Sequence, residues 1–227
     1  MKFGAIVLAA GASERMGASK PLLRIGDTTF LERVLDRLDE VPDIAAVVVV
    51  LGARAPLIRE QIDFGRAVPV QHRGYKEGMF SSVRAGARAL IRKLPDLEGA
   101  LVCLVDMPLV QVETYARVAA AFQPETDDVV IAAFSGEAGH PLLLSRALVE
   151  RLADVSLAAP SEETLSDFID THAERRRFVD AQDPTVLVNI NTPDAYRVHI
   201  GEAVEAVDDD DPRDPGPADP GVADEPT

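Results

Sequence analysis

The chain has 227 residues, of which 47% are hydrophobic, and it carries a formal net charge of −15 and one cysteine. This hydrophobic content can form a real core, and the pattern along the chain favours one large α/β domain. The acidic balance argues against nucleic-acid binding, which normally needs a basic face. We see no leader and no apolar run near the roughly 18 residues that cross a bilayer, so we expect a soluble, cytoplasmic protein without membrane association.

The first feature along the chain is the small-residue loop LAAGASERMGASK, from Leu8 to Lys20, between a predicted strand over Phe3–Leu8 and a helix expected near Thr29. Small residues after a strand leave backbone N–H groups open to a phosphate. Arg15 can bind phosphate oxygens in a bidentate way, and Lys20 adds a point charge. The glycine spacing excludes a Walker A loop and a G-x-G-x-x-G motif. We predict an anion-binding loop; the alternative is an ordinary surface loop rich in turn residues.

After this loop, apolar strands alternate with helices. The predicted strands are Ala45–Leu51, Val68–Gln71, Ala100–Val105, Val129–Phe134, Pro141–Leu144 and Val186–Ile190. The predicted helices are Ala55–Ile62, Gly78–Leu94, Glu113–Phe122, Arg146–Ala153, Glu162–Thr171 and one from Pro193, capped by Thr192. The glycine-rich link between the fourth and fifth of these strands suggests a hairpin or an antiparallel pair. The repeated units predict an α/β fold with a Rossmann-like, doubly wound, mainly parallel sheet.

In such a sheet, ligands bind beyond the carboxyl ends of the strands. Asp106 follows the buried run ALVCLVD, and a carboxylate held there suits Mg²⁺, although it could instead cap the next helix. Asn189 to Asp194 (NINTPD) follows the last predicted strand and could offer a second oxygen ligand, besides the cap at Thr192. Cys103, inside the same apolar run as Asp106, is expected to be a buried thiol.

Two more segments carry candidate residues. In HRGYKEGMFSSVRAG, from His72 to Gly86, Gly78 lets the backbone approach a ligand and Ser81 could hydrogen-bond a base or a ribose. The alternative is a helix cap at Ser81 or Ser82. His140, in Gly-His-Pro, could contact substrate or be a structural histidine before a strand.

The C-terminal segment holds most of the net charge. From Glu202 onward there are ten acidic residues and one base, Arg213, which makes this segment −9 and leaves −6 for the rest. Its prolines and few apolar residues predict disorder from about Val207, so we expect a domain over residues 1–200 and an acidic tail over 201–227. The simplest role of the tail is solubility; a metal or partner role for the aspartates at 208–211 is the alternative.

Taken in this order and at these spacings, LAAGASERMGASKPLL, YKEGMFSSVRAG, LVDMP, GHPLLL and NINTPDAY resemble the MobA/MocA-like nucleotidyltransferase family, and within it the molybdenum cofactor cytidylyltransferases. The resemblance covers Met1 to about His199. It implies a nucleotide-diphospho-sugar transferase type of fold and Mg²⁺-dependent transfer of a nucleoside monophosphate from an NTP to a phosphate-bearing acceptor, with release of pyrophosphate. An acceptor phosphate needs no general base, and we find no candidate catalytic triad.

The resemblance also implies roles for individual residues. It assigns the base and ribose to Leu8, Ala9, Ala10 and Gly11, the triphosphate to Arg15 and Lys20, the second nucleotide segment to Gly78 and Ser81, Mg²⁺ to Asp106 with Asn191 or Asn189, and the acceptor side to His140.

The chain departs from the family pattern in three places. Glu137 and Ala138 stand where an Arg often precedes Gly-His-Pro, SEETLSDFI replaces a G-x-R-x-L-L segment, and Asn189 and Asn191 stand where Asp is common. The first two departures lie on the acceptor side. They leave open whether the acceptor is a molybdopterin-type molybdenum cofactor or a sugar phosphate or other small phosphorylated molecule. The resemblance also implies a nucleotide preference: in this family the Ala10-Gly11 form of the first motif, rather than Gly-Gly, favours CTP over GTP.

Two hypotheses of another class remain beside the transferase. A nicotine blue oxidoreductase-like enzyme would need a redox cofactor, for which the chain shows no G-x-G-x-x-G motif. A non-catalytic chaperone that binds cofactor for a molybdenum enzyme would not need Arg15, Lys20 and Asp106 together. A cytidylyltransferase would itself pass its product to such an enzyme or to its chaperone.

Overall fold

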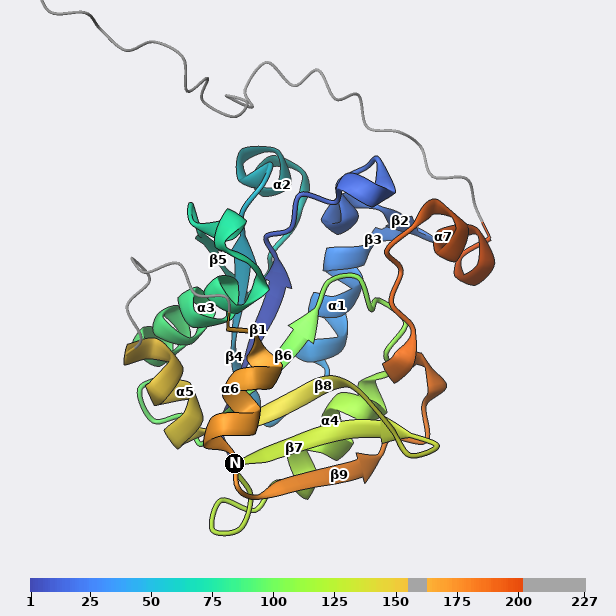
Figure 1. The fold of residues 1–227 in the computed structure, drawn as a ribbon. Coiled ribbons are helices and arrows are strands. Elements are labelled where there is room, and N and C mark those ends of the chain that lie inside the picture. Colours follow the sequence, from blue (N-terminus) through green and yellow to red (C-terminus); the bar gives the residue numbers. More distant parts are fainter. Residues whose placement is uncertain (155–162, 202–227) are drawn as a thin grey trace, which may run out of the picture.

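The main sheet of the described residues has seven strands, with helices on both faces (Figure 1). The computed structural model describes residues 1–154 and 163–201, so the predicted acidic tail from Val207 lies outside the described residues. The strands are β1 (Phe3–Ala9), β4 (Ile44–Leu51), β5 (Val68–Gln71), β6 (Gly99–Leu104), β7 (Val129–Phe134), β8 (Glu137–Ser145) and β9 (Arg176–Asp180). Their order is β5-β4-β1-β6-β8-β7-β9.

Strands β5, β4, β1 and β6 form the parallel half of the sheet. Every residue of β1 is buried, as expected of a parallel strand that is covered on both faces. Its side chains alternate between the two faces, so that Val7 packs with helix α1 (Phe30–Asp39) and Ile6 with helix α3 (Met79–Lys93). The carboxyl ends of these strands share one edge of the sheet, where doubly wound folds bind ligands. The predicted α/β, mainly parallel fold is confirmed.

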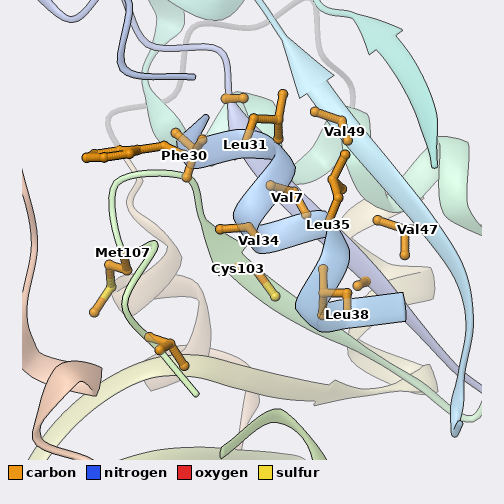
Figure 2. Close-up of a cluster of buried hydrophobic side chains, with 14 of the residues drawn as sticks. Val7, Phe30, Leu31, Val34, Leu35, Leu38, Val47, Val49, Cys103 and Met107 are labelled. Atoms are coloured by element: carbon orange, nitrogen blue, oxygen red, sulfur yellow. The ribbon is translucent and has the colours of Figure 1, made fainter. Parts of the chain in front are cut away.

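The helices divide between the two faces. Helix α1 begins at a capping box in which Thr29 and Glu32 exchange hydrogen bonds. Figure 2 shows its side chains above β1, β4 and β6, with Cys103 among them. Cys103 is buried, as predicted, and burial raises the pKa of its thiol. The helices besides α1 and α3 are α2 (Ala55–Gln61), α4 (Val112–Ala121), α5 (Arg146–Asp154), α6 (Leu165–His172) and α7 (Pro193–His199). None of the described helices is both long and apolar enough to cross a bilayer.

The other half of the sheet contains the antiparallel strand. β8 runs antiparallel to both β6 and β7, which confirms the predicted hairpin between Val129–Phe134 and the segment around Pro141. β8 begins at Glu137 rather than at Pro141, and its His140–Pro141 peptide bond is cis.

The strand predicted over Val186–Ile190 is wrong. Residues Pro184–Leu187 form a 3₁₀ turn, η4, because Pro184 lacks an N–H for a strand ladder and Asp183 accepts a hydrogen bond from Thr185 N. The edge position beside β7 is taken instead by β9, which the sequence analysis missed. In RRFVD the exposed positions include Arg176 and Phe178, so this edge strand lacks the continuous apolar run that marked the buried strands.

A small two-stranded ribbon, β2 (Arg24–Ile25) with β3 (Thr28–Thr29), was not predicted either. It joins the N-terminal loop to the end of the described chain. The Tyr196 hydroxyl of α7 donates to the Arg24 carbonyl at 2.6 Å, and its ring stacks on Phe30. Figure 1 shows α7 beside this ribbon, so α7 closes the fold next to the loop that begins at Leu8.

Candidate active site

A cleft of about 500 Å³ opens at the carboxyl ends of the parallel strands. It contains ten of the residues that the sequence analysis singled out: Leu8, Ala9, Ala10, Gly11, Arg15, Lys20, Gly78, Asp106, Asn189 and Asn191. Ser81 and His140 are not among its lining residues. The other lining residues are Ser13, Pro21, Tyr75, Met79, Ser82, Leu104 and Val105.

The loop from Leu8 to Lys20 folds back on itself at one side of this cleft. The Ser13 hydroxyl accepts a hydrogen bond from Lys20 N at 3.1 Å, and Ser13 has a φ of 60°. Arg15 lies in the segment closed by this hydrogen bond and is exposed. The helix expected after the loop begins only at Phe30, beyond η2 (Lys20–Leu22) and the β2–β3 ribbon, and α1 supplies no residue to the cleft lining. If the loop binds an anion as predicted, its backbone and cations would do so without the N-terminus of α1.

Lys20, Asp106 and Asn191 meet on the β6 side of the cleft. Lys20 Nζ lies 2.8 Å from Asp106 Oδ2 and also donates to Asn191 Oδ1. Both side chains of the ion pair are only 16% exposed, so solvent screens this interaction less than at an open surface.

The backbone explains how Asn191 reaches this point without a strand. The N–H of Ile190 donates to the Asp106 carbonyl at 2.8 Å, and the Ile190 side chain is fully buried. One irregular segment thus carries Asn189 and Asn191 to the exit of β6. The predicted strand is absent, yet Asn189 and Asn191 still line the cleft; their role as ligands stays a prediction.

The oxygen donors of Asp106 and Asn191 fit a hard divalent cation. Both accept from the same ammonium group, so their oxygens already converge on one centre of positive charge. Carboxylate and amide oxygens are ligands that Mg²⁺ accepts, and it commonly takes the rest from water and substrate phosphates. Within residues 1–154 and 163–201 no group of three or more His, Cys, Asp or Glu side chains forms a closed metal cage. A metal ion bound by Asp106 and Asn191 would therefore keep coordination positions open for the oxygens of a phosphate.

At the start of α3, the helical phase separates two neighbouring serines. Both serines are buried, at 3% and 1% exposed, but Ser82 lines the cleft together with Gly78 and Met79 whereas Ser81 does not. The Ser81 hydroxyl donates to the Gly78 carbonyl at 2.7 Å and lies 2.9 Å from His72 Nε2. The i, i+3 spacing could not have separated the two serines, because Gly78 is three residues before Ser81 just as Met79 is three residues before Ser82.

His140 lies on β8, outside the cleft lining but within electrostatic reach of it. Burial lowers the pKa of His140, and the negative charge of Asp106 acts in the opposite direction. Its imidazole is therefore favoured in the neutral form, and the acceptor-side role that the resemblance implied remains a prediction.

Comparisons with known proteins give one matching family model and several similar proteins. The model of the MobA-like NTP transferase domain matches residues 5–176. A molybdenum cofactor guanylyltransferase of Rhizobium meliloti (strain 1021) is 31% identical over 201 residues, which are 85% of this chain and 88% of the relative. The crystal structure of Rv0371c from Mycobacterium tuberculosis H37Rv superposes with a TM-score of 0.74 at 26% identity, over 89% of this chain and 98% of that one. A manganese complex of Rv0371c superposes with a TM-score of 0.69 at 24% identity, over 89% and 100%.

The family model spans most of the chain, and the alignment with the guanylyltransferase covers 88% of that relative. Both the loop that opens at Leu8 and the exit of β6 at Asp106 lie inside the matched residues. The chain therefore belongs to the family of MobA-like NTP transferase domains and is a nucleotidyltransferase, as its motifs led us to expect.

Proposed function

We propose that this chain transfers a nucleoside monophosphate from an NTP to a molybdopterin-type molybdenum cofactor and releases pyrophosphate. The observation that carries the proposal is the meeting of Lys20, at the end of the small-residue loop, with Asp106 and Asn191 in the cleft that this loop lines. The name of the Rhizobium meliloti relative supports a molybdenum cofactor as the acceptor. The product would then pass to a molybdenum enzyme or its chaperone.

The proposed chemistry needs alignment and charge neutralisation rather than an acid–base pair. An oxygen of the acceptor phosphate attacks the α-phosphorus, a new P–O bond forms, and the bond to the β-phosphate oxygen breaks to release pyrophosphate. Backbone groups of the loop from Leu8 hold the nucleoside, while Arg15 and Lys20 neutralise the triphosphate. A divalent cation on Asp106 and Asn191 would supply Lewis-acid stabilisation of phosphoryl charge, and the manganese complex of Rv0371c is in line with this.

The nucleotide is proposed to be CTP, with GTP as the second candidate. Ala10 lines the cleft, and the family resemblance links the Ala10-Gly11 form of this motif, rather than Gly-Gly, to CTP. That observation favours the smaller pyrimidine base. GTP is favoured by the guanylyltransferase name of the Rhizobium meliloti relative. A methyl-sized difference in a binding site discriminates by only about 10- to 200-fold, so both nucleotides need to be measured.

The test measures pyrophosphate release with CTP, GTP, UTP or ATP, with and without molybdopterin-type cofactor, in Mg²⁺, in Mn²⁺ and in chelator. The proposal expects cofactor-dependent release that is fastest with CTP and is abolished by the chelator. Fastest release with GTP would keep the reaction and replace the nucleotide. Release that depends on a sugar phosphate, and not on the molybdenum cofactor, would overturn the proposed acceptor.

A further inference from the structure

The cleft has a charged side and an apolar side, and the sheet order separates them. Lys20, Asp106 and Asn191 meet beside β6. Tyr75 and Met79 lie across β1, because η3 (Tyr75–Glu77) and the start of α3 follow β5 at the other end of the parallel half. A nucleoside triphosphate has the same division, with a charged phosphate chain at one end and a flat base at the other.

The base of the Tyr75 side chain packs closely against the backbone at Gly52. A Cβ atom at Gly52, just after β4, would come within 2.6 Å of Tyr75 Cβ and 2.4 Å of the Ala10 carbonyl oxygen. The ring base is therefore pressed against the end of β4 and the first motif, with no room for a side chain between them. Tyr75 is half-buried and packs against the apolar cluster under α3, yet it still lines the cleft.

The turn that bears Tyr75 is fastened at both ends. Glu77 N donates to the Gly74 carbonyl at 2.9 Å and closes the turn. From behind, the Ser81 hydroxyl donates to the Gly78 carbonyl at 2.7 Å and lies 3.2 Å from the Gly74 carbonyl oxygen. His72 Nε2 is 2.9 Å from the same hydroxyl. Ser81 thus acts on the cleft through the turn rather than by contact with a ligand.

We propose that Tyr75 is the platform on which the nucleobase of the NTP stacks, and that the His72–Ser81 pair holds this platform in place. This inference rests on one part of the proposed function, namely that an NTP binds in the cleft. It does not depend on the acceptor. Every base has a π-face, so an aromatic platform adds affinity without choosing among bases. The choice of base is left to the polar backbone groups of the first motif, near Ala10.

The ring, not the hydroxyl, is the functional part. Among the described residues, no group accepts a hydrogen bond from the Tyr75 hydroxyl. Tyr75→Phe should therefore keep the platform, whereas Tyr75→Leu keeps apolar volume but no aromatic face. This pair of variants separates stacking from simple burial.

The experiment measures dissociation constants by calorimetry for CTP, GTP and inorganic tripolyphosphate, each with Mg²⁺, on the full chain. Tripolyphosphate reports the phosphate half of the cleft because it has no base. Tyr75→Ala should weaken CTP and GTP binding by roughly 5- to 100-fold and leave tripolyphosphate binding unchanged. Tyr75→Leu should weaken nucleotide binding in the same direction, and Tyr75→Phe should bind like the unaltered chain. Phe178→Ala, which removes a 59% exposed ring on the edge strand β9, is the matched control.

Fluorescence provides a second readout. The chain has three tyrosines and no tryptophan, and Tyr115 and Tyr196 are each only 2% exposed. Stacking of a base on Tyr75 should quench tyrosine emission as nucleotide is added. This response should vanish in Tyr75→Phe although the affinity persists.

The possible results separate this inference from the proposed function. Unchanged CTP and GTP affinity in Tyr75→Ala and Tyr75→Leu would overturn the platform. Equal losses for nucleotide and tripolyphosphate would also overturn it, since they would show a structural role. The Tyr75 variants could lose affinity for CTP and GTP but not for tripolyphosphate, while the unaltered chain releases no pyrophosphate with molybdenum cofactor. That result would support the platform and overturn the proposed acceptor.

Discussion

Asp106 is held in place from its backbone and from its side chain. Its carbonyl accepts from Ile190 N, and its carboxylate pairs with Lys20. The turn after it is anchored by Arg37 of α1, which donates to the Pro108 carbonyl at 2.7 Å and to the Val110 carbonyl. A carboxylate fixed in this way costs little reorganisation when charge develops beside it, which suits the proposed metal-binding role.

Asp106→Asn tests that role at the level of a single residue. The amide keeps the shape but removes the charge that the proposed metal ion needs, so we expect turnover to fall by about 100-fold or more with the fold intact. Pyrophosphate release and the affinity for Mn²⁺ are the measurements. Asp96→Asn, at an exposed surface ion pair with Lys2, is the control and should change neither. Full turnover in Asp106→Asn would exclude the carboxylate from the chemistry.

His72 gives a prediction about pH and stability. Burial lowers its pKa below the ordinary value of 6.5; the charge of Glu77 acts against this and that of Arg84 acts with it. The unfolded chain therefore binds the proton more readily, so the stability contributed by neutral His72 is present above pH 6.5 and is lost as the pH falls through the folded-state pKa. His72→Gln should flatten the dependence of the unfolding free energy on pH below about 6.5.

Denaturant unfolding between pH 5 and pH 8 measures this effect, with His140→Gln as the comparison. Burial also lowers the pKa of His140, so this residue contributes to the same slope. If the slope persists unchanged in His72→Gln and disappears in His140→Gln, the pH dependence belongs to His140 alone.

At the scale of elements, the turn η4 stands where a last strand was predicted, and the segment after it brings Asn189 and Asn191 to the cleft. Asp183 is 5% exposed and joins η4 to α4: it accepts from Gln111 N at 3.0 Å, from the Thr114 hydroxyl at 2.8 Å and from Thr185 N at 3.0 Å. Through this junction the segment toward Asn191 is directed to the exit of β6. Pattern analysis missed it because one buried carboxylate, not a run of apolar residues, organises the turn.

Asp183→Asn tests the junction. Burial by itself would raise the pKa of Asp183, but the hydrogen bonds from Thr185, Gln111 and Thr114 outweigh it and the pKa is lowered. The stabilisation is therefore present above the unfolded value of 3.8 and is lost as the pH falls through the folded-state pKa. We expect the variant to lose about 1.5–3 kcal/mol at pH 7 and to show a weaker acid dependence.

Urea unfolding at pH 7 and at several acid pH values provides the measurement. Asp194→Asn, whose side chain is 84% exposed, is the control for removal of a surface charge. Equal stability of Asp183→Asn and the unaltered chain at pH 7 would mean that the junction is not needed.

At the scale of the whole molecule, the net charge opposes the proposed substrate. The chain carries −15, of which the segment from Glu202 contributes −9. A nucleoside triphosphate is itself a polyanion, so long-range repulsion should slow its approach at low ionic strength. The positive charges of Arg15 and Lys20 act only near the cleft.

Truncation after Gly201 tests this repulsion. The truncated chain carries −6, and we expect a higher kcat/KM for the NTP at low salt, with the difference shrinking as the Debye length falls toward about 8 Å at 0.15 M. A full-length variant with the ten acidic residues after Gly201 replaced by Asn or Gln is the control for chain length. A difference that is independent of salt, or absent in that control, would contradict the electrostatic explanation.

The sequence by itself determined the fold class, most of the elements and most of the residues in the cleft. The reason is that continuous apolar runs, such as β1 and β4, and the small-residue loop after Leu8 each have a local physical signature. Only the tertiary structure decided that β9 is the edge strand and η4 a turn, because packing and one buried carboxylate override local pattern there. It also turned Ser81 inward and Ser82 and Tyr75 toward the cleft, since the phase of α3 and the close contact at Gly52 depend on how distant segments meet.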